Sequence, residues 1–387
     1  MLLAIASFYV GLVPKVALAI NVSQKTEFEL QTQHRIFNSD SSTRETSMTD
    51  QYFIGRTTFQ FDPSPSYGVE FQPELRALYT RGRELSATDP AALDLPEADR
   101  LVPRELMYVV RDDFVATLNI ERLNASYRFN EGSFLVGRRA VTLGNFRTLV
   151  ILNKFSAAPL QSVGYPFYFG QDGATWTYGG AVHQFRAISI LGERRERDAH
   201  LLEWKVGGNG FELQALGGKW WNRMAYGFAP TLDVGGGSLR LEVLTVPDDE
   251  MTQAGLGFER ALGESFKFIF ESLYQNLGAR DASEITLASP SPYMIFRSRM
   301  IGLGQLEYAG LSYWNFSLGL ARSFSDGSLI GAFRTQYSVS DYCDVYFDSR
   351  VPITESQGEF STYSLSLPGG RSVGQNTYAS LGLKIFF

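Results

Sequence analysis

The sequence predicts an all-β fold, an antiparallel up-and-down transmembrane β-barrel of about 18 strands. Three observations lead to this prediction. Apolar and polar residues alternate with a period of two, short connectors alternate with long polar ones, and the composition is rich in aromatic residues and glycine. The first observation indicates strands, the second indicates hairpins with one tight and one long end, and the third favours strands and turns over a helical bundle.

The composition excludes several classes of protein. Hydrophobic residues make up 44% of the 387 residues and charged residues 20%, so the chain is not disordered by composition. A formal net charge of −6 argues against a nucleic-acid-binding protein, which would be basic. The single cysteine, Cys343, excludes an intrachain disulfide and a multi-cysteine metal site, and three histidines leave little material for a histidine site. We expect no metal and no cofactor.

The N-terminus has the features of a secretory signal peptide. An apolar run from Leu2 to Val13 is followed by Val16-Ala17-Leu18-Ala19, which places small residues before a cleavage point after Ala19. A run of about 12 apolar residues is too short for a spanning helix, which needs about 20. No Lys or Arg precedes the run, so an uncleaved anchor and a buried strand remain alternatives. We expect a signal peptide over residues 1–19 and one barrel domain over residues 20–387.

The period-two pattern defines the strands in chain order. In the first of them, Phe28, Leu30 and Ile36 fall on one face, with Glu27 and Glu29 on the other. The same analysis predicts strands near 22–37, 51–62, 66–80, 112–129, 133–144, 174–182, 184–192, 199–207, 210–221, 226–235, 238–246, 252–261, 265–276, 297–309, 313–324, 328–339, 342–351 and 376–387. The split within 174–192 has no obvious turn, and without it the count falls to about 16.

The connectors alternate between tight turns and long segments. Tight turns such as Asn130-Glu131-Gly132 and Gly235-Gly236-Gly237 alternate with long polar segments such as 81–103 and 277–297. Transmembrane barrels have this asymmetry, with short periplasmic turns and long outer loops. We also expect a short helix within 87–100, and a β-bulge near Glu121, where the apolar row changes face.

Charged residues on the polar faces favour a membrane barrel over a soluble one. Pairs such as Arg240 with Glu242, and Lys267 with Glu271, suit a wet lumen better than a dry soluble core. Aromatic residues near strand ends, among them Trp220 and Trp221, suit the aromatic girdles of a membrane barrel. A large secreted β-sandwich or solenoid is the alternative fold.

Two stretches resemble a known family. In the first, Tyr378 to Phe387, apolar residues alternate with others and the last residue is aromatic. The second, Leu123 to Gly144, combines Tyr127-Arg128-Phe129, a Gly132 turn, Leu135-Val136-Gly137-Arg138-Arg139 and Leu143-Gly144. The first resembles the closing strand of Gram-negative outer-membrane proteins, and the second resembles a hairpin of the β-barrel porins, including the substrate-specific and alginate-export-like families. The resemblance implies that Phe387 is part of the signal read by the barrel-assembly machinery, and that the loop 145–173 occupies the position of a constriction loop.

A catalytic site has little support in the sequence. No Gly-x-Ser-x-Gly motif surrounds a serine, and His183 and His200 are the only histidines suited to act as a base, since His34 falls on the apolar row of its strand. We therefore expect no enzymatic activity, with an outer-membrane hydrolase as the third interpretation.

The loop 145–173 is unusually apolar for an outer loop. Folding it into the barrel would bury its Phe, Leu, Ile and Tyr side chains, while packing over the rim or against a neighbouring subunit is the alternative. The candidate pore-lining or constriction residues are Arg147, Lys154, Arg128, Arg139, Arg240, Glu242, Lys267 and Glu271.

The sequence thus predicts an outer-membrane channel for passive diffusion of small hydrophilic solutes. Outer-membrane lipids, the assembly machinery and small solutes are the expected partners, and a homo-oligomer is left open. The main alternative is a non-conducting barrel that acts as a receptor, an adhesin or a structural protein. Both signs of charge occur on the lumen rows, so a strongly one-sided ion preference is not expected.

Overall fold

The computed structural model describes residues 21–38, 45–81, 105–111, 113–156, 170–180, 182–192, 194–285, 294, 296–354, 358–360, 365–366, 372–373 and 377–387. The predicted signal peptide at 1–19 and the predicted helix within 87–100 lie outside these residues. Within the described part of the chain, no helix is both long and apolar enough to cross a bilayer.

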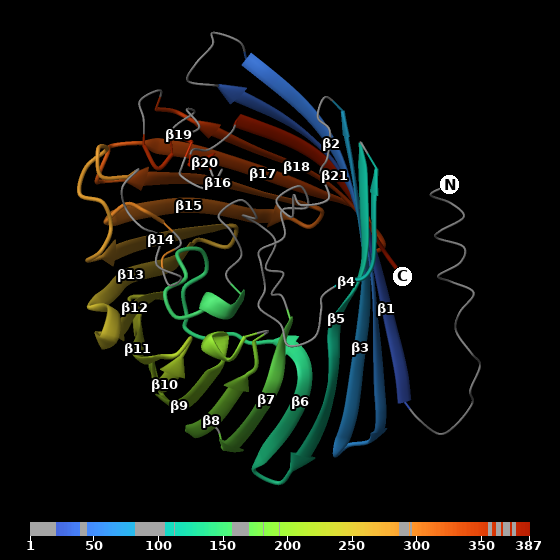
Figure 1. Cartoon of the computed structure of the whole chain (residues 1–387), viewed down its shortest axis with the longest axis vertical. Coiled ribbons are helices and arrows are strands. Elements are labelled where there is room, and N and C mark those ends of the chain that lie inside the picture. Colours follow the sequence, from blue (N-terminus) through green and yellow to red (C-terminus); the bar gives the residue numbers. More distant parts are fainter. Residues whose placement is uncertain are drawn as a thin grey trace.

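Eighteen antiparallel strands close into a single barrel (Figure 1). They are β1 (Asn21–Asn38), β2 (Glu45–Ser64), β3 (Tyr67–Arg81), β5 (Phe114–Phe129), β6 (Gly132–Ala140), β7 (Gly170–Gly179), β8 (His183–Ile190), β9 (Ala199–Gly208), β10 (Phe211–Trp220), β11 (Arg223–Val234), β12 (Gly237–Val246), β13 (Met251–Leu262), β14 (Phe266–Gln275), β15 (Met300–Leu311), β16 (Trp314–Ser323), β17 (Leu329–Ser340), β18 (Cys343–Pro352) and β21 (Thr377–Phe386). The prediction of 18 strands is confirmed, including the split between β7 and β8, so the count of 16 is wrong.

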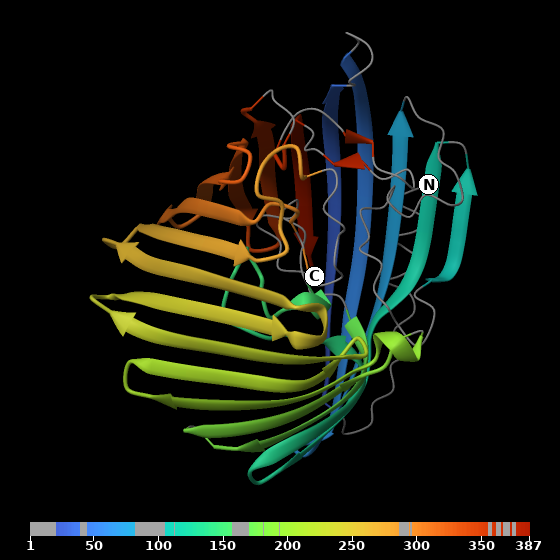
Figure 2. The same cartoon turned by 60° about the vertical axis from the view of Figure 1, so that its left-hand side comes forward.

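Short strands outside the ring were not predicted. β4 (Glu105–Arg111) pairs with the extracellular half of β5, and β19 (Leu365–Ser366) pairs with β20 (Ser372–Val373) in the loop after β18. β5 therefore has β4 beside its upper half and β6 beside its lower half (Figure 2).

The predicted bulge in β5 is present. Gln72 of β3 pairs with Arg122, while the next residue, Pro73, pairs with Ile120, which leaves Glu121 as the extra residue. Alternate residues from Val115 to Glu121 are buried, and beyond the bulge the buried position moves to Asn124. The extra residue therefore changes which residues face inward, as a bulge does.

The outward face of the barrel is apolar and exposed. Its side chains include Leu202, 69% exposed, and Leu381, 59% exposed, and they recur along every flank of the ring. The inward rows carry most of the charged side chains, among them Glu27, Arg56 and Glu242. An apolar belt around a polar interior in a closed ring is the arrangement that a bilayer requires, and each of the 18 ring strands pairs with two neighbours in the ring.

The C-terminal residue closes the ring at the periplasmic end. β21 pairs with both β1 and β18, and the backbone N–H groups of Phe387 and Thr26 each donate to the other residue's carbonyl, at 2.9 and 3.0 Å. The Phe387 ring also meets Phe28 edge to face at 5.9 Å. Phe387 thus completes the seam between the first and last strands of the ring.

Deletion of Phe387 is predicted to lower the fraction of folded barrel at least about twofold, because two hydrogen bonds worth about 1 kcal/mol each are lost from the seam. The band that shifts between unboiled and boiled samples measures this fraction. Phe387→Ala, which keeps both backbone bonds and loses only the ring, should have a smaller effect. A deletion variant that folds as well as the wild type would contradict this account of the seam.

Candidate functional site

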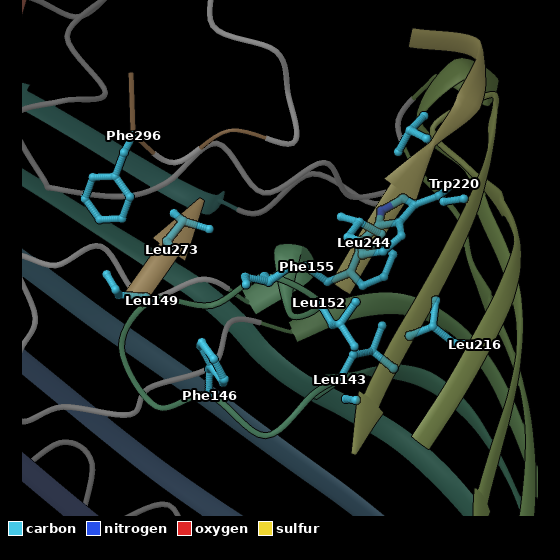
Figure 3. Close-up of a cluster of buried hydrophobic side chains, with 14 of the residues drawn as sticks. Leu143, Phe146, Leu149, Leu152, Phe155, Leu216, Trp220, Leu244, Leu273 and Phe296 are labelled. Atoms are coloured by element: carbon cyan, nitrogen blue, oxygen red, sulfur yellow. The ribbon is translucent and has the colours of Figure 1, made fainter. Parts of the chain in front are cut away.

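The chain enters the barrel after β6. Residues 141–156, called here the inward segment, end in the 3₁₀ turn η2 (Lys154–Ser156) and lie against the inner face of the wall rather than outside it (Figure 3). The inward placement of this part of the loop 145–173 is therefore observed, and packing over the rim is wrong for residues 145–156. Residues 157–169 of the loop lie outside the described residues.

Apolar packing holds the inward segment to one side of the lumen. Seven of its side chains belong to the main buried cluster of the barrel: Val141, Leu143, Phe146, Leu149, Ile151, Leu152 and Phe155. They meet buried residues of the wall such as Ile188 of β8, Leu244 of β12 and Leu273 of β14. Phe155 stacks on Trp220 with ring centroids 4.8 Å apart. Trp220 is thus fully buried inside the barrel, and its predicted place in an outer aromatic girdle is wrong.

Glu242 of β12 binds the backbone of the inward segment. Its Oε1 accepts hydrogen bonds from the N–H groups of Asn145 and Phe146, the latter at 2.8 Å, and its Oε2 accepts one from Leu152 at 3.2 Å. The side chain is only 1% exposed. A buried carboxylate is costly unless it is hydrogen-bonded, and here both oxygens are used.

Glu271 of β14 accepts hydrogen bonds from the backbone N–H groups of the three residues that follow Phe146. The N–H of Arg147 donates to its Oε1 at 2.7 Å, and those of Thr148 and Leu149 donate to Oε2 at 3.0 and 2.8 Å. Glu271 is also 1% exposed. Glu242 and Glu271 point into the barrel, as predicted from the alternation. They are covered by the inward segment, however, so they anchor the segment and do not line the channel as expected.

Glycines in the wall make room for the segment. A Cβ atom added to Gly255 of β13 would lie 2.6 Å from side-chain atoms of both Phe146 and Ile151, and one added to Gly227 of β11 would lie 2.8 Å from Leu152. No real Cβ is found so close to a neighbour. The absence of side chains at these wall positions therefore lets the segment approach the sheet closely.

Three of the predicted basic residues meet around one carboxylate. Glu259 of β13 accepts from Arg147 at 2.9 Å and from Arg240 at 2.6 Å, and the Lys267 ammonium lies 3.7 Å away. Lys267 also pairs with Glu307 of β15 at 2.6 Å. We call these five residues the Glu259 cluster. Its most accessible member is Arg147, whose side chain is 45% exposed. Glu259 and Glu307 were absent from the predicted site, although both occupy inward positions of their strands.

The other predicted residues lie elsewhere. The Lys154 Nζ donates to the carbonyl of Val150 at 2.9 Å, so this half-buried ammonium is turned toward the segment's own backbone. Burial lowers the pKa of Lys154 from 10.5 to about 7, and the negative charge of Glu242 only partly opposes this shift. Arg128 is exposed near the periplasmic end of β5, and Arg139 is half-buried at the end of β6. Neither arginine joins the Glu259 cluster.

The opposite side of the ring carries a second set of charges. Arg56 of β2 pairs with Glu74 of β3 at 2.5 Å and with Glu27 of β1 at 3.6 Å, and Lys384 of β21 lies 3.2 Å from Glu27. We call these four residues the opposite ladder: Glu27, Arg56, Glu74 and Lys384. Between this ladder and the Glu259 cluster, Arg334 of β17 lies 3.7 Å from Asp348 of β18. Both walls therefore present cations that are already paired with carboxylates.

The histidines do not form a complete catalytic triad. His200 Nδ1 lies 3.0 Å from the Oγ of Ser189, but no carboxylate or amide among the described residues bonds to the ring. His34 contacts the Thr49 hydroxyl at 3.2 Å, and His183 stacks on Trp204. No group of three or more potential metal ligands is found in the described part of the chain.

Solved structures of bacterial Occ and Opd proteins have the same architecture. OccK5 (OpdH) of Pseudomonas aeruginosa matches with a TM-score of 0.57 at 9% sequence identity, covering 95% of this chain and 98% of that one. OccAB1 of Acinetobacter baumannii matches with a TM-score of 0.52 at 11% identity, covering 94% and 96%. Pseudomonas aeruginosa OpdK, solved with vanillate, matches with a TM-score of 0.52 at 10% identity, covering 94% and 98%. At these identities the likeness establishes the fold. No protein-family model and no curated protein matches the chain.

Replacing both anchors, Glu242→Ala with Glu271→Ala, is predicted to release the inward segment, since six backbone N–H groups lose their acceptors. Single-channel conductance in planar bilayers should then rise severalfold while the heat-shifted band remains. Glu70→Ala, which removes an inward carboxylate of β3 that binds Asn124 and not the segment, is the matched control. Unchanged conductance in the folded double variant would contradict the anchoring role.

Gly255→Leu tests the glycine cradle independently of charge. An added Cβ would lie 2.6 Å from the ends of the Phe146 and Ile151 side chains and from the Ser272 carbonyl oxygen of β14, so a leucine should displace the segment's side chains from the wall. We expect single-channel conductance to differ from that of the wild type. Gly304→Leu, at a position of β15 where an added Cβ meets nothing within 4 Å, is the control. Equal conductance of both variants would argue against close packing on Gly255.

Lys154 should make the ion preference of a current through the barrel depend on pH. Because its pKa is lowered to about 7, this residue is mostly neutral at pH 8 and mostly charged at pH 6. Acidification across this range adds one positive charge inside the barrel, so reversal potentials in a salt gradient should shift toward anions. The shift should be smaller in Lys154→Met. An equal shift in that variant would assign the pH dependence to other groups.

Proposed function

We propose that this chain is an outer-membrane channel for the passive diffusion of small hydrophilic solutes, with the inward segment as its constriction. The observation that carries the proposal is the clamping of residues 145–152 inside a closed barrel by Glu242 and Glu271. A barrel with an apolar outer belt and paired charges within has a wet interior. A segment anchored to one wall narrows that interior.

The charges of the two walls suggest how solutes are selected. Arg147 is accessible on the inward segment, while its partner Glu259 also binds Arg240 and lies near Lys267. The opposite ladder contains cations and carboxylates in direct contact. Pairing cancels most of the field that either sign would create, so size and orientation at the constriction should matter more than net charge.

The alternatives are less well supported. A receptor or adhesin would place its function in the outer loops and would not need an anchored segment within the barrel. A hydrolase would need an orienting group for His200, which the described residues do not supply. The anchored segment therefore favours the channel.

The route to the membrane follows from the same proposal. Residues 1–19 would direct export and be removed after Ala19, and the barrel of residues 20–387 would then be inserted by the outer-membrane assembly machinery. The exposed ring of Phe387 beside Phe28 is the surface that we propose this machinery contacts. A homo-oligomer is compatible with this route but is not required by it.

Conductance and reversal potential of the purified protein test the function directly. We expect discrete conductance steps in planar bilayers. Permeability for small cations and anions should differ by less than about tenfold, a ratio equivalent to about 1.4 kcal/mol, because the lumen charges are paired. An inserted barrel without conductance would refute the channel, and a near-ideal preference for one sign would refute the balance of lumen charges.

A further inference from the structure

The outward face of the barrel carries an arginine at the extracellular end of β16. Arg322 is exposed and follows Leu318 and Leu320, the outward residues of the same strand, with a spacing of two. It therefore points toward the membrane and not into the lumen. Its guanidinium lies 5.7 Å from the ring of Phe324, which is 54% exposed on the same face.

A second arginine lies at the same end of the neighbouring strands. Arg299, just before β15, places its guanidinium 5.4 Å from the ring of Tyr274, an exposed residue at the end of β14, and its Nη2 donates to the Tyr274 hydroxyl at 3.0 Å. The Arg299 Nε is buried and has no hydrogen-bond partner. β14, β15 and β16 are consecutive in the wall (Figure 1), so the two arginines flank one patch of the outer surface.

The surroundings of the two arginines are apolar and aromatic. Phe324, Tyr274 and Met300 are exposed between them, and an added Cβ at Gly302 would lie 2.9 Å from the Phe324 ring, so that ring lies flat on the sheet. The nearest described carboxylate of the β16–β17 loop, Asp326, accepts hydrogen bonds from Ser328 and from the Glu359 backbone. Neither Arg299 nor Arg322 forms an ion pair with any described residue.

An arginine on the lipid-facing side of a barrel requires a counter-charge. Its cost is greatest in the hydrocarbon and falls toward the interface, where the aromatic girdle lies and lipid phosphates are available. The planar guanidinium donates two parallel hydrogen bonds to phosphate oxygens, and the rings beneath it restrict its orientation. Acyl chains of the same lipid would cover Phe324, Met300 and Leu320.

We propose that Arg299 and Arg322 bind the phosphate groups of a phosphorylated lipid in the extracellular leaflet, with Tyr274 and Phe324 as the supporting rings. The site depends on the membrane location in the proposed function, but not on conduction. It lies on the outer surface of β14–β16, while the Glu259 cluster and the inward segment lie within the barrel.

Native mass spectrometry of the detergent-purified barrel tests this site. The probes are diphosphorylated lipid A, the same lipid after removal of its phosphates, and inorganic phosphate. We expect adducts with the phosphorylated lipid only. Arg299→Gln and Arg322→Gln should each weaken binding about fivefold, and the double variant about 30-fold, as about 1 kcal/mol per basic residue near a membrane surface implies. Arg→Lys at both positions should retain part of the binding, since the charge remains.

The matched control is Arg260→Gln. Arg260 is an exposed arginine on the periplasmic end of β13, two residues beyond Phe258 on the outward row, so it has the same chemistry at the wrong end of the barrel. Its replacement should leave lipid binding unchanged. Equal binding of the dephosphorylated lipid, equal loss in Arg260→Gln or undiminished binding in the double variant would each overturn the proposal. Adducts with inorganic phosphate alone would show an anion site and not a lipid site. The heat-shifted band and conductance of each variant separate failure of this site from failure of the channel.

Discussion

The structure depends on two buried carboxylates, Glu242 and Glu271. They accept the backbone hydrogen bonds of the inward segment, which has almost no regular secondary structure and so few backbone acceptors of its own. A chain that leaves a strand and crosses a barrel interior carries N–H groups with no ladder to join, and each unsatisfied buried group costs about 1–3 kcal/mol. Glu242 and Glu271 accept six of these groups from within the wall. The apolar side chains of the segment can then face the wall, where Gly227 and Gly255 leave room for them.

This arrangement makes the interior of the barrel asymmetric. The walls around β8 to β15 pack against the inward segment, whereas β1 to β3 and β21 carry the opposite ladder, whose Arg56, Glu74 and Lys384 are also buried. Arg147 links the position of the segment to the charge of the interior. Its backbone N–H donates to Glu271, while its side chain pairs with Glu259 in the accessible interior. Release of the segment would therefore change both the width of the channel and its charge.

The alternation of residues was sufficient to predict the barrel but not the contents of its interior. Strand boundaries agree to within a few residues for most of the ring, because each strand has one lipid-facing row whose period is visible in the sequence. The same alternation placed Glu242 and Glu271 on the inner face, but a period cannot show what covers that face. Their partners are 90 to 124 residues away along the chain. Trp220 was placed on the outer face for the same reason, since the alternation did not reveal that Phe155 covers it. The strand β4 was missed because it pairs only with β5 and is not one of the 18 strands that form the ring.

Hydrogen exchange at the backbone of residues 145–152 tests the central claim most directly, because it measures the bonds to the two carboxylates themselves. In the folded barrel in detergent, the amides of residues 145–149 and 152 should exchange as slowly as those of the neighbouring strands β12 and β14. They should become fast when Glu242 and Glu271 are replaced together while the strands remain protected. Fast exchange of these amides in the wild-type barrel would contradict the anchored segment and, with it, the proposed constriction.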